Sequence, residues 1–172
     1  MPAANRGTRG MMCVDMLVRA RAKSDEPAVA RFLRPRHSEI VARLGRLERP
    51  LDHPALIAEE DGTLAGVLTY VIKGENCEIL TLHAAERARG VGTALLAAIE
   101  PLAREHGCRR LWLLTTNDNV DALRFYQRRG FRLAELHPGA TAAARETLKP
   151  EIPHLGNHDL PIRDEIILEK LL

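Results

Sequence analysis

The chain has 172 residues, 45% of them hydrophobic and 28% charged, which is the composition of one ordinary globular domain. A net charge of +2 and an aromatic content of 3% provide neither a strong positive field nor a platform for stacked bases, which argues against nucleic-acid binding. Three cysteines without C-x-x-C spacing indicate free thiols in a reducing compartment. No apolar run reaches the roughly 18 residues of a membrane span, and no signal-peptide core opens the chain. We therefore expect a cytoplasmic protein with neither a nucleic-acid nor a membrane partner.

The N-terminal third predicts one strand and two helices. We expect residues 1–10 to form a disordered tail and residues 11–172 to form a single domain, which begins with an alternating, strand-like segment at residues 13–19. Ser24 or Asp25 caps the first helix, which has a proline in its first turn and ends at Pro35. An arginine-rich second helix is expected over residues 38–47, with these apolar positions turned inward: Ile40, Val41, Leu44 and Leu47.

The middle of the chain predicts three consecutive strands. Residues 55–59 and 64–72 are largely apolar and flank an Asp61-Gly62 turn, which is typical of a hairpin. Residues 75–83 form the next apolar segment, and a glycine-containing loop follows them.

The second half alternates helices and strands. The first helix runs from Gly92 to Gly107, and Pro101 is expected to kink it near Ala97 and Ala98 because an interior proline removes one hydrogen bond. The elements expected after it are a strand at 110–116, a helix from Asn119 to Gly130, a strand at 131–136, a short helix at 140–148 and a last strand at 164–171. This order predicts an α/β fold with a mixed sheet between helices.

The loop between the third middle strand and the following helix reads RARGVGTALL and has the features of a phosphate site. Gly90 and Gly92 allow a tight turn and close approach of the backbone to a ligand. The helix after them presents unpaired N–H groups, while Arg87 and Arg89 add positive charge. No Gly-Lys-Ser/Thr follows, which excludes a nucleotide triphosphatase loop, and Leu95 is too large for the third position of a dinucleotide fingerprint.

Two blocks resemble the GNAT superfamily of N-acetyltransferases. Residues 87–92 match [R/Q]-x-x-G-x-[G/A], and residues 119–131, NVDALRFYQRRGF, are similar to N-x-x-A-x-x-x-Y-x-x-x-G-F. The resemblance implies the GNAT fold, an α/β fold whose mixed, mostly antiparallel central sheet is flanked by helices on both faces. It also implies acetyl-CoA as the acetyl donor for a primary amine, with no metal.

The resemblance further implies where acetyl-CoA lies. The pyrophosphate is expected on the loop, whose contact residues are Arg87, Arg89, Gly90, Val91, Gly92 and Thr93. The pantetheine arm is expected to contact Leu82, His83, Ala84, Asn119, Ala122 and Tyr126.

Two side chains are candidates for the chemistry. Tyr126 lies seven residues after Asn119, hence on the same helix face, and is expected to protonate the leaving thiolate. Glu78 is the expected general base, acting directly or through water, and alternation places it on one strand face with Leu80 and Leu82. The match at Glu78 is partial, because its distance to the loop is two residues shorter than in the family pattern. His83 remains a minor alternative base.

The acceptor cannot be identified from the sequence. We expect a small-molecule or peptide amine and direct transfer in a ternary complex, and the sequence leaves a homodimer open. The alternative is a non-catalytic acyl-CoA-binding module of the same fold, because Leu114 occupies a position at which some relatives carry a catalytic Glu. The proline-rich residues 149–165 are expected to form an ordered lid over the site or a plain surface loop. Their His154, His158 and Asp159 lack further ligands at metal-binding spacing.

Overall fold

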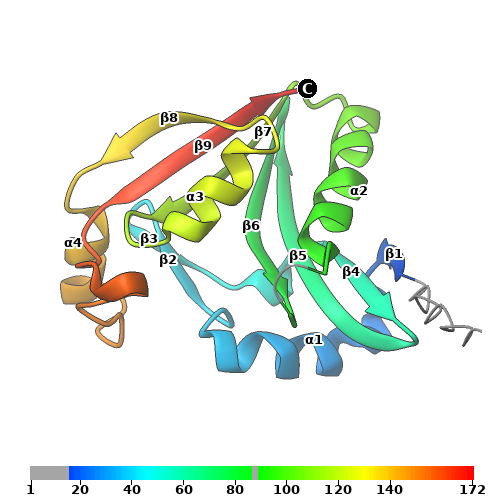
Figure 1. Ribbon diagram of the computed structural model, residues 1–172, viewed down its shortest axis with the longest axis horizontal. Helices are drawn as coiled ribbons and strands as arrows, with labels where there is room; N and C mark the ends of the chain where they lie inside the picture. The colour runs from blue at the N-terminus through cyan, green and yellow to red at the C-terminus, as the bar shows by residue number, and fades with distance from the viewer. Residues whose placement is uncertain (1–15, 87–88) are drawn as a thin grey trace, which may run out of the picture.

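A seven-stranded mixed sheet forms the centre of the computed structural model, which describes residues 16–86 and 89–172 (Figure 1). The strands follow the order β1-β4-β5-β6-β7-β9-β8, and every neighbouring pair is antiparallel except β6 and β7. Their bounds are β1 Met16–Ala20, β4 Ala55–Glu60, β5 Thr63–Lys73, β6 Asn76–Ala84, β7 Arg110–Thr116, β8 Arg132–His137 and β9 Glu165–Leu171. The expected mixed, mostly antiparallel sheet is confirmed. The expected tail at residues 1–10 lies outside the described residues, as do Arg87 and Ala88 of the loop.

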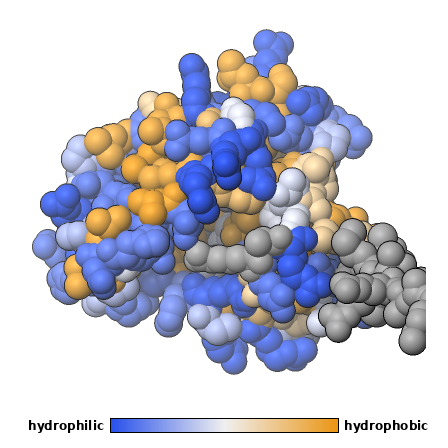
Figure 2. Space-filling view, viewed as in Figure 1, coloured by the Kyte–Doolittle hydropathy of each residue, from blue (hydrophilic) through white to orange (hydrophobic). Residues whose placement is uncertain are grey.

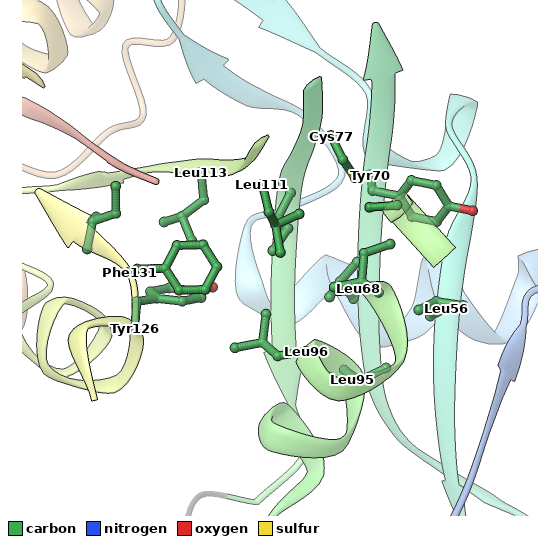
Figure 3. Close-up of a cluster of buried hydrophobic side chains, with 14 of the residues drawn as sticks. Leu56, Leu68, Tyr70, Cys77, Leu95, Leu96, Leu111, Leu113, Tyr126 and Phe131 are labelled. Carbon is green, nitrogen blue, oxygen red and sulfur yellow. The ribbon is translucent and has the colours of Figure 1, made fainter. Parts of the chain in front are cut away.

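Helices cover both faces of this sheet (Figure 1). Helices α2 (Val91–Glu105) and α3 (Val120–Gln127) bury their apolar sides in the larger core cluster, part of which is drawn in Figure 3. Helix α1 (Glu26–Leu33) packs on the opposite face, in a smaller cluster with β4 and β5. Helix α4 (Ala140–Thr147) contacts β2 (Val41–Arg43), at the end of the sheet away from β1. Within the described residues, no helix is both long enough and apolar enough to cross a membrane.

The helix expected over residues 38–47 is wrong. This segment contains a two-stranded hairpin of β2 and β3 (Arg46–Glu48), in which Arg43 pairs with Arg46. The two residues between the strands, Leu44 and Gly45, have φ values of 46° and 73°, as a two-residue hairpin turn with positive φ at both centres requires. Of the four apolar positions expected to face inward, Leu44 and Leu47 are exposed by 38% and 45%, Ile40 is also exposed, and Val41 is half-buried. The residue that the hairpin buries is instead Arg43.

Helix α2 continues as one α-helix through Pro101. Its buried residues are Val91, Leu95, Leu96, Ile99 and Ala103, which recur at helical spacing and anchor it to the sheet on both sides of the proline.

The face in Figure 2 is mainly hydrophilic, with apolar residues in separate patches. Among the described residues, Leu133 and Leu136 are large apolar side chains with 55% and 61% exposure. Both belong to β8, which is an edge strand of the sheet.

Candidate active site

A cleft opens where the two parallel strands in the middle of the sheet separate. Strands β6 and β7 pair only from Asn76–Ile79 to Arg110–Leu113, although β6 continues to Ala84 and β7 to Thr116. The space between their diverging ends is part of a cleft of about 400 Å³, which α3, the β2 region, α4 and the C-terminal segment also line. In this part of the sheet, the backbone groups on the facing edges of β6 and β7 therefore do not hydrogen-bond to each other.

A β-bulge in β6 coincides with this separation. Thr81 pairs with Thr69 of β5 and Ile79 pairs with Tyr70, so that Leu80 between them has no partner residue in the ladder. Bulges of this kind redirect side chains and are enriched next to active sites.

The bulge reverses the alternation of side chains along β6. Leu82, beyond the bulge, packs in the core cluster under α2. Glu78, before the bulge, pairs with Val71 and contacts Arg43 of the hairpin, on the opposite face. The expectation that Glu78 and Leu82 share a face is therefore wrong, because an extra residue interrupts the two-residue period.

The phosphate-loop end of the site is the N-terminus of α2. Gly90 is its N-cap residue, has a φ of +85° and provides no side-chain cap, so that the first-turn N–H groups remain available to an anion. A Cβ added at Gly92 would lie 3.1 Å from the ring of Phe125, which shows how closely α2 approaches α3. Val91 is buried as the first residue of the helix.

The charges beside this helix end differ from those expected. Arg89 is ion-paired to Glu60 at 3.2 Å and to Glu86 at 3.3 Å, so its charge is already balanced. Arg129, which the sequence analysis missed, donates to the Thr93 hydroxyl at 2.5 Å and stacks on Phe125, and its buried Nε has no hydrogen-bond partner among the described residues. In the sequence, Arg129 stands within the second motif beside Arg128, and no pattern there distinguishes it as a binding residue.

The second motif forms one wall of the cleft. Asn119 is the N-cap residue of α3, and its Oδ1 accepts a hydrogen bond from the Ala122 N–H at 3.3 Å. Asn119, Ala122 and Tyr126 all line the cleft, as three residues on one helix face can. Across the cleft, Leu82 and His83 line the opposite wall, while Ala84 ends β6 next to them.

Tyr126 has the surroundings of a neutral phenol. Its side chain is buried, with edge-to-face contacts to Phe125 and Phe131 at ring-centre distances of 5.1 and 5.4 Å (Figure 3). Burial raises the pKa of Tyr126 well above its usual range, and the charge of Arg129 opposes only part of this shift. Its hydroxyl has no hydrogen-bond partner among residues 16–86 and 89–172, and it can therefore donate to a ligand in the cleft.

Glu78 forms a buried ion pair beneath the cleft. Its Oε1 lies 2.6 Å from Nη2 of Arg43, at angles outside those of a hydrogen bond, and both side chains are at most 5% exposed. Burial raises the pKa of Glu78, and Arg43 opposes this shift. Arg43 lines the cleft and donates from Nη1 to the carbonyl of Leu80, the bulge residue, whereas Glu78 lies behind Arg43.

His83 lies on the same face of the sheet as Glu78 and contacts the segment that follows α1. Its Nε2 is 2.8 Å from the hydroxyl of Ser38, and both residues line the cleft. Burial, with a further contribution from Arg36, lowers the pKa of His83 to about 4. The imidazole is therefore neutral at pH 7.

A second carboxylate, missed by the sequence analysis, lines the cleft directly. Glu165 begins β9 and is 2% exposed, and its Oε2 accepts a hydrogen bond from the Leu44 N–H at the hairpin tip at 3.0 Å. In the sequence, Glu165 stands among other charged residues at the start of an expected strand, so no pattern distinguished it.

Hydrogen bonds hold the C-terminal segment before β9, residues 149–164, to the rest of the domain. Asn117 donates to the carbonyl of Pro161 and accepts from the N–H groups of Arg163 and Asp164, at 2.9–3.0 Å. Arg145 binds three further carbonyls of the segment, including that of Ile162. Since Lys149, Ile152 and Ile162 line the cleft, this segment is a wall of the site. The described residues contain no group of three or more side chains that could hold a metal ion.

Comparison with known proteins agrees with this geometry. Residues 19–131 match the model of the acetyltransferase (GNAT) family. YdhI of Bacillus subtilis (strain 168), an uncharacterized protein, is 45% identical over 113 residues, which make up 66% of this chain and 70% of that protein.

Solved structures share the fold. An IAA acetyltransferase from Bacillus cereus ATCC 14579 has a TM-score of 0.71 at 20% identity, over 92% of this chain and 100% of that chain. A GNAT family acetyltransferase from Elizabethkingia anophelis with acetyl-CoA bound has a TM-score of 0.64 at 18% identity, over 91% and 98% of the two chains. The match of residues 19–131 and these likenesses confirm the expected family and fold, and the chain belongs to the GNAT family of acetyltransferases.

Proposed function

We propose that the chain transfers the acetyl group of acetyl-CoA to a primary amine in one direct step, with both substrates bound at once. The observation that carries this proposal is the separation of β6 and β7, which connects two sides of the sheet through one cleft. The N-terminus of α2 is available to phosphates on one side, and the face with Arg43, His83 and Glu165 is available to an acceptor on the other.

The donor binds along the open edge of β6. Beyond Ile79, the strand has no partner on the β7 side, so the amide groups of a pantetheine arm are able to pair with the backbone of Leu82, His83 and Ala84 as an added strand would. The N–H groups of α2 receive the pyrophosphate, and Arg129 supplies a positive charge beside Thr93. The relative with acetyl-CoA bound supports the same donor.

The chemistry needs an acid and a base. The amine nitrogen attacks the thioester carbonyl carbon, a C–N bond forms and the C–S bond breaks. The departing sulfur takes the hydroxyl proton of Tyr126, and the proton lost by the amine passes to a base, from which it returns to Tyr126 through solvent. Tyr126 suits its role because its raised pKa keeps the proton on the phenol until the thiolate, a stronger base than water, appears.

Glu78 is proposed as the base, acting through water. Its pKa is raised by burial, which brings its proton affinity towards that of a working base, and its partner Arg43 lines the cleft. Glu165 is the rival, since it lines the cleft itself. Replacement of each by Gln decides between them: the base is the residue whose loss removes the acidic limb of the pH profile of kcat.

Direct transfer agrees with the positions of the cysteines. Cys77 and Cys108 are buried, free and absent from the lining of the cleft, while Cys13 lies outside the described residues. Burial raises the pKa of Cys77 to about 12, so this residue is a thiol and not a nucleophilic thiolate.

Release of coenzyme A with a panel of amines tests the proposal. Thiol titration should show amine-dependent turnover, and initial-rate plots at several acetyl-CoA concentrations should intersect, as a ternary complex requires. Parallel plots would indicate an acetyl-enzyme instead. Acetyl-CoA binding without coenzyme A release, with every amine, would favour a non-catalytic acyl-CoA-binding module.

A further inference from the structure

Charges are segregated across the acceptor side of the cleft. At its inner end, one guanidinium, Arg43, faces two carboxylates: Glu78 at 2.6 Å and Glu165, whose charge also acts on Arg43. All three side chains are buried. The inner end therefore has an excess of negative charge, which suits an incoming amine.

The rim of the cleft carries the opposite charge. Arg36 and Lys149 both line it and are half-buried, and neither has a carboxylate partner among residues 16–86 and 89–172. Arg19, by contrast, is paired with Asp25 and Glu59. Two uncompensated cations at the edge of a cleft are a binding feature for an anion.

Neutral contacts hold these two cations in place. Lys149 Nζ donates to the carbonyls of His37 at 3.1 Å and Ile40 at 2.6 Å. The Arg36 guanidinium stacks on the ring of Phe32 at 3.8 Å and donates to the Phe32 carbonyl. Since Lys149 binds the residue next to Arg36, the two cations belong to one rim, and their charges remain available to a ligand.

Hydrogen bonds of Ser38 hold the loop that presents Arg36. His37 has a φ of 52°, in the left-handed region, and Ser38 donates to the carbonyl of Arg36 at 3.1 Å or to His83 at 2.8 Å. Because the pKa of His83 is lowered, its ring adds no further positive charge at pH 7. The anion-binding character of this rim therefore comes from Arg36 and Lys149.

We infer that the acceptor is a small molecule that carries a carboxylate as well as its amine, with the carboxylate on Arg36 and Lys149 and the amine towards Glu165 and Glu78. This inference rests on the proposed acetyl transfer and names its substrate class. A cleft of about 400 Å³, which must also admit the thioester end of the donor, favours a molecule of amino-acid size.

A matched acceptor series tests this inference. The common amino acids, their carboxamides and their decarboxylated amines are compared by coenzyme A release from saturating acetyl-CoA. We expect kcat/KM for the preferred amino acid to exceed that of its carboxamide at least 10-fold. In Arg36→Gln and Lys149→Gln this advantage should fall below about 3-fold, a change of roughly 0.7 kcal/mol or more from the parent. Arg34→Gln is the matched control, because Arg34 is exposed and paired with Glu39.

The outcomes separate the inference from the proposed function. If carboxamides or plain amines are acetylated as well as amino acids, or if the advantage survives both variants, acetyl transfer stands and the inference is overturned. If no amine releases coenzyme A, the proposed transfer falls, and calorimetric titration of the acetyl-CoA-loaded protein tests the rim by itself. Binding of an amino acid at least 10-fold tighter than its carboxamide, lost in Lys149→Gln, would then support the inference, and equal or absent binding would overturn it.

Discussion

Tyr126→Phe should abolish most turnover without weakening the fold. The hydroxyl is buried among the rings of Phe125 and Phe131 and has no hydrogen-bond partner among the described residues. Removal of an unpaired polar atom from an apolar site changes the free energy of unfolding by less than about 1 kcal/mol. Loss of a general acid costs about 10²-fold to 10⁴-fold in kcat.

The chain provides a matched control for this substitution. Tyr70 is its only other tyrosine, is 8% exposed in the same core cluster and does not line the cleft. Figure 3 shows Tyr70 and Tyr126 at opposite ends of this cluster. Tyr70→Phe should therefore have the same small effect on stability and none on catalysis.

The assay is coenzyme A release at saturating acetyl-CoA, together with calorimetric binding of acetyl-CoA and thermal unfolding of each variant. We expect Tyr126→Phe to keep its acetyl-CoA affinity and melting temperature while kcat falls at least 10²-fold. Unchanged kcat in Tyr126→Phe, or an equal loss in Tyr70→Phe, would refute the role of Tyr126 as the acid.

Three further predictions concern the surroundings of the cleft. Arg43→Met leaves Glu78 buried without its partner and should lower the free energy of unfolding by about 3–5 kcal/mol in urea titration, and an Arg43→Met/Glu78→Met double variant should recover much of this loss. Asn117→Ala removes three hydrogen bonds, so amide exchange over residues 149–164 should accelerate while exchange in α2 does not. Between about pH 6.5 and 4, His83 binds more protons in the unfolded chain than in the folded chain, so the free energy of unfolding should decrease as the pH is lowered through this window. The decrease should be steeper in the parent than in His83→Gln, and equal slopes would show that the pKa of His83 is not lowered.

The sequence predicted the parts of the fold that local patterns determine. The strand, loop and helix around Gly90 and the α3 block from Asn119 to Tyr126 follow from apolar periodicity and from glycine and asparagine positions. In the structure, the α3 block lines the cleft and α2 packs closely against it at Gly92. The glycine loop and the α3 block each depend on residues close together in the chain, which is why a single sequence predicts them.

The features that the sequence did not show depend on distant partners. The spacing of apolar residues from Ile40 to Leu47 fits a helix as well as a hairpin, and the hairpin in the structure buries Arg43 against Glu78, 35 residues later in the chain. The bulge at Leu80 depends on the register with β5, which no pattern within β6 records. Glu165 lines the cleft, where the N–H of Leu44, from the first third of the chain, donates to it.

Calorimetric titration with acetyl-CoA tests the central claim most directly. The parent should bind with micromolar affinity, and Gly90→Glu should abolish binding by adding a bulky negative side chain at the phosphate end of α2. Gly107→Glu is the matched control, since Gly107 also has a positive φ, +77° against +85° at Gly90, and open space around its Cβ position. Retained binding in Gly107→Glu and lost binding in Gly90→Glu would establish the donor site, whereas no binding by the parent, or equal binding by both variants, would contradict the account.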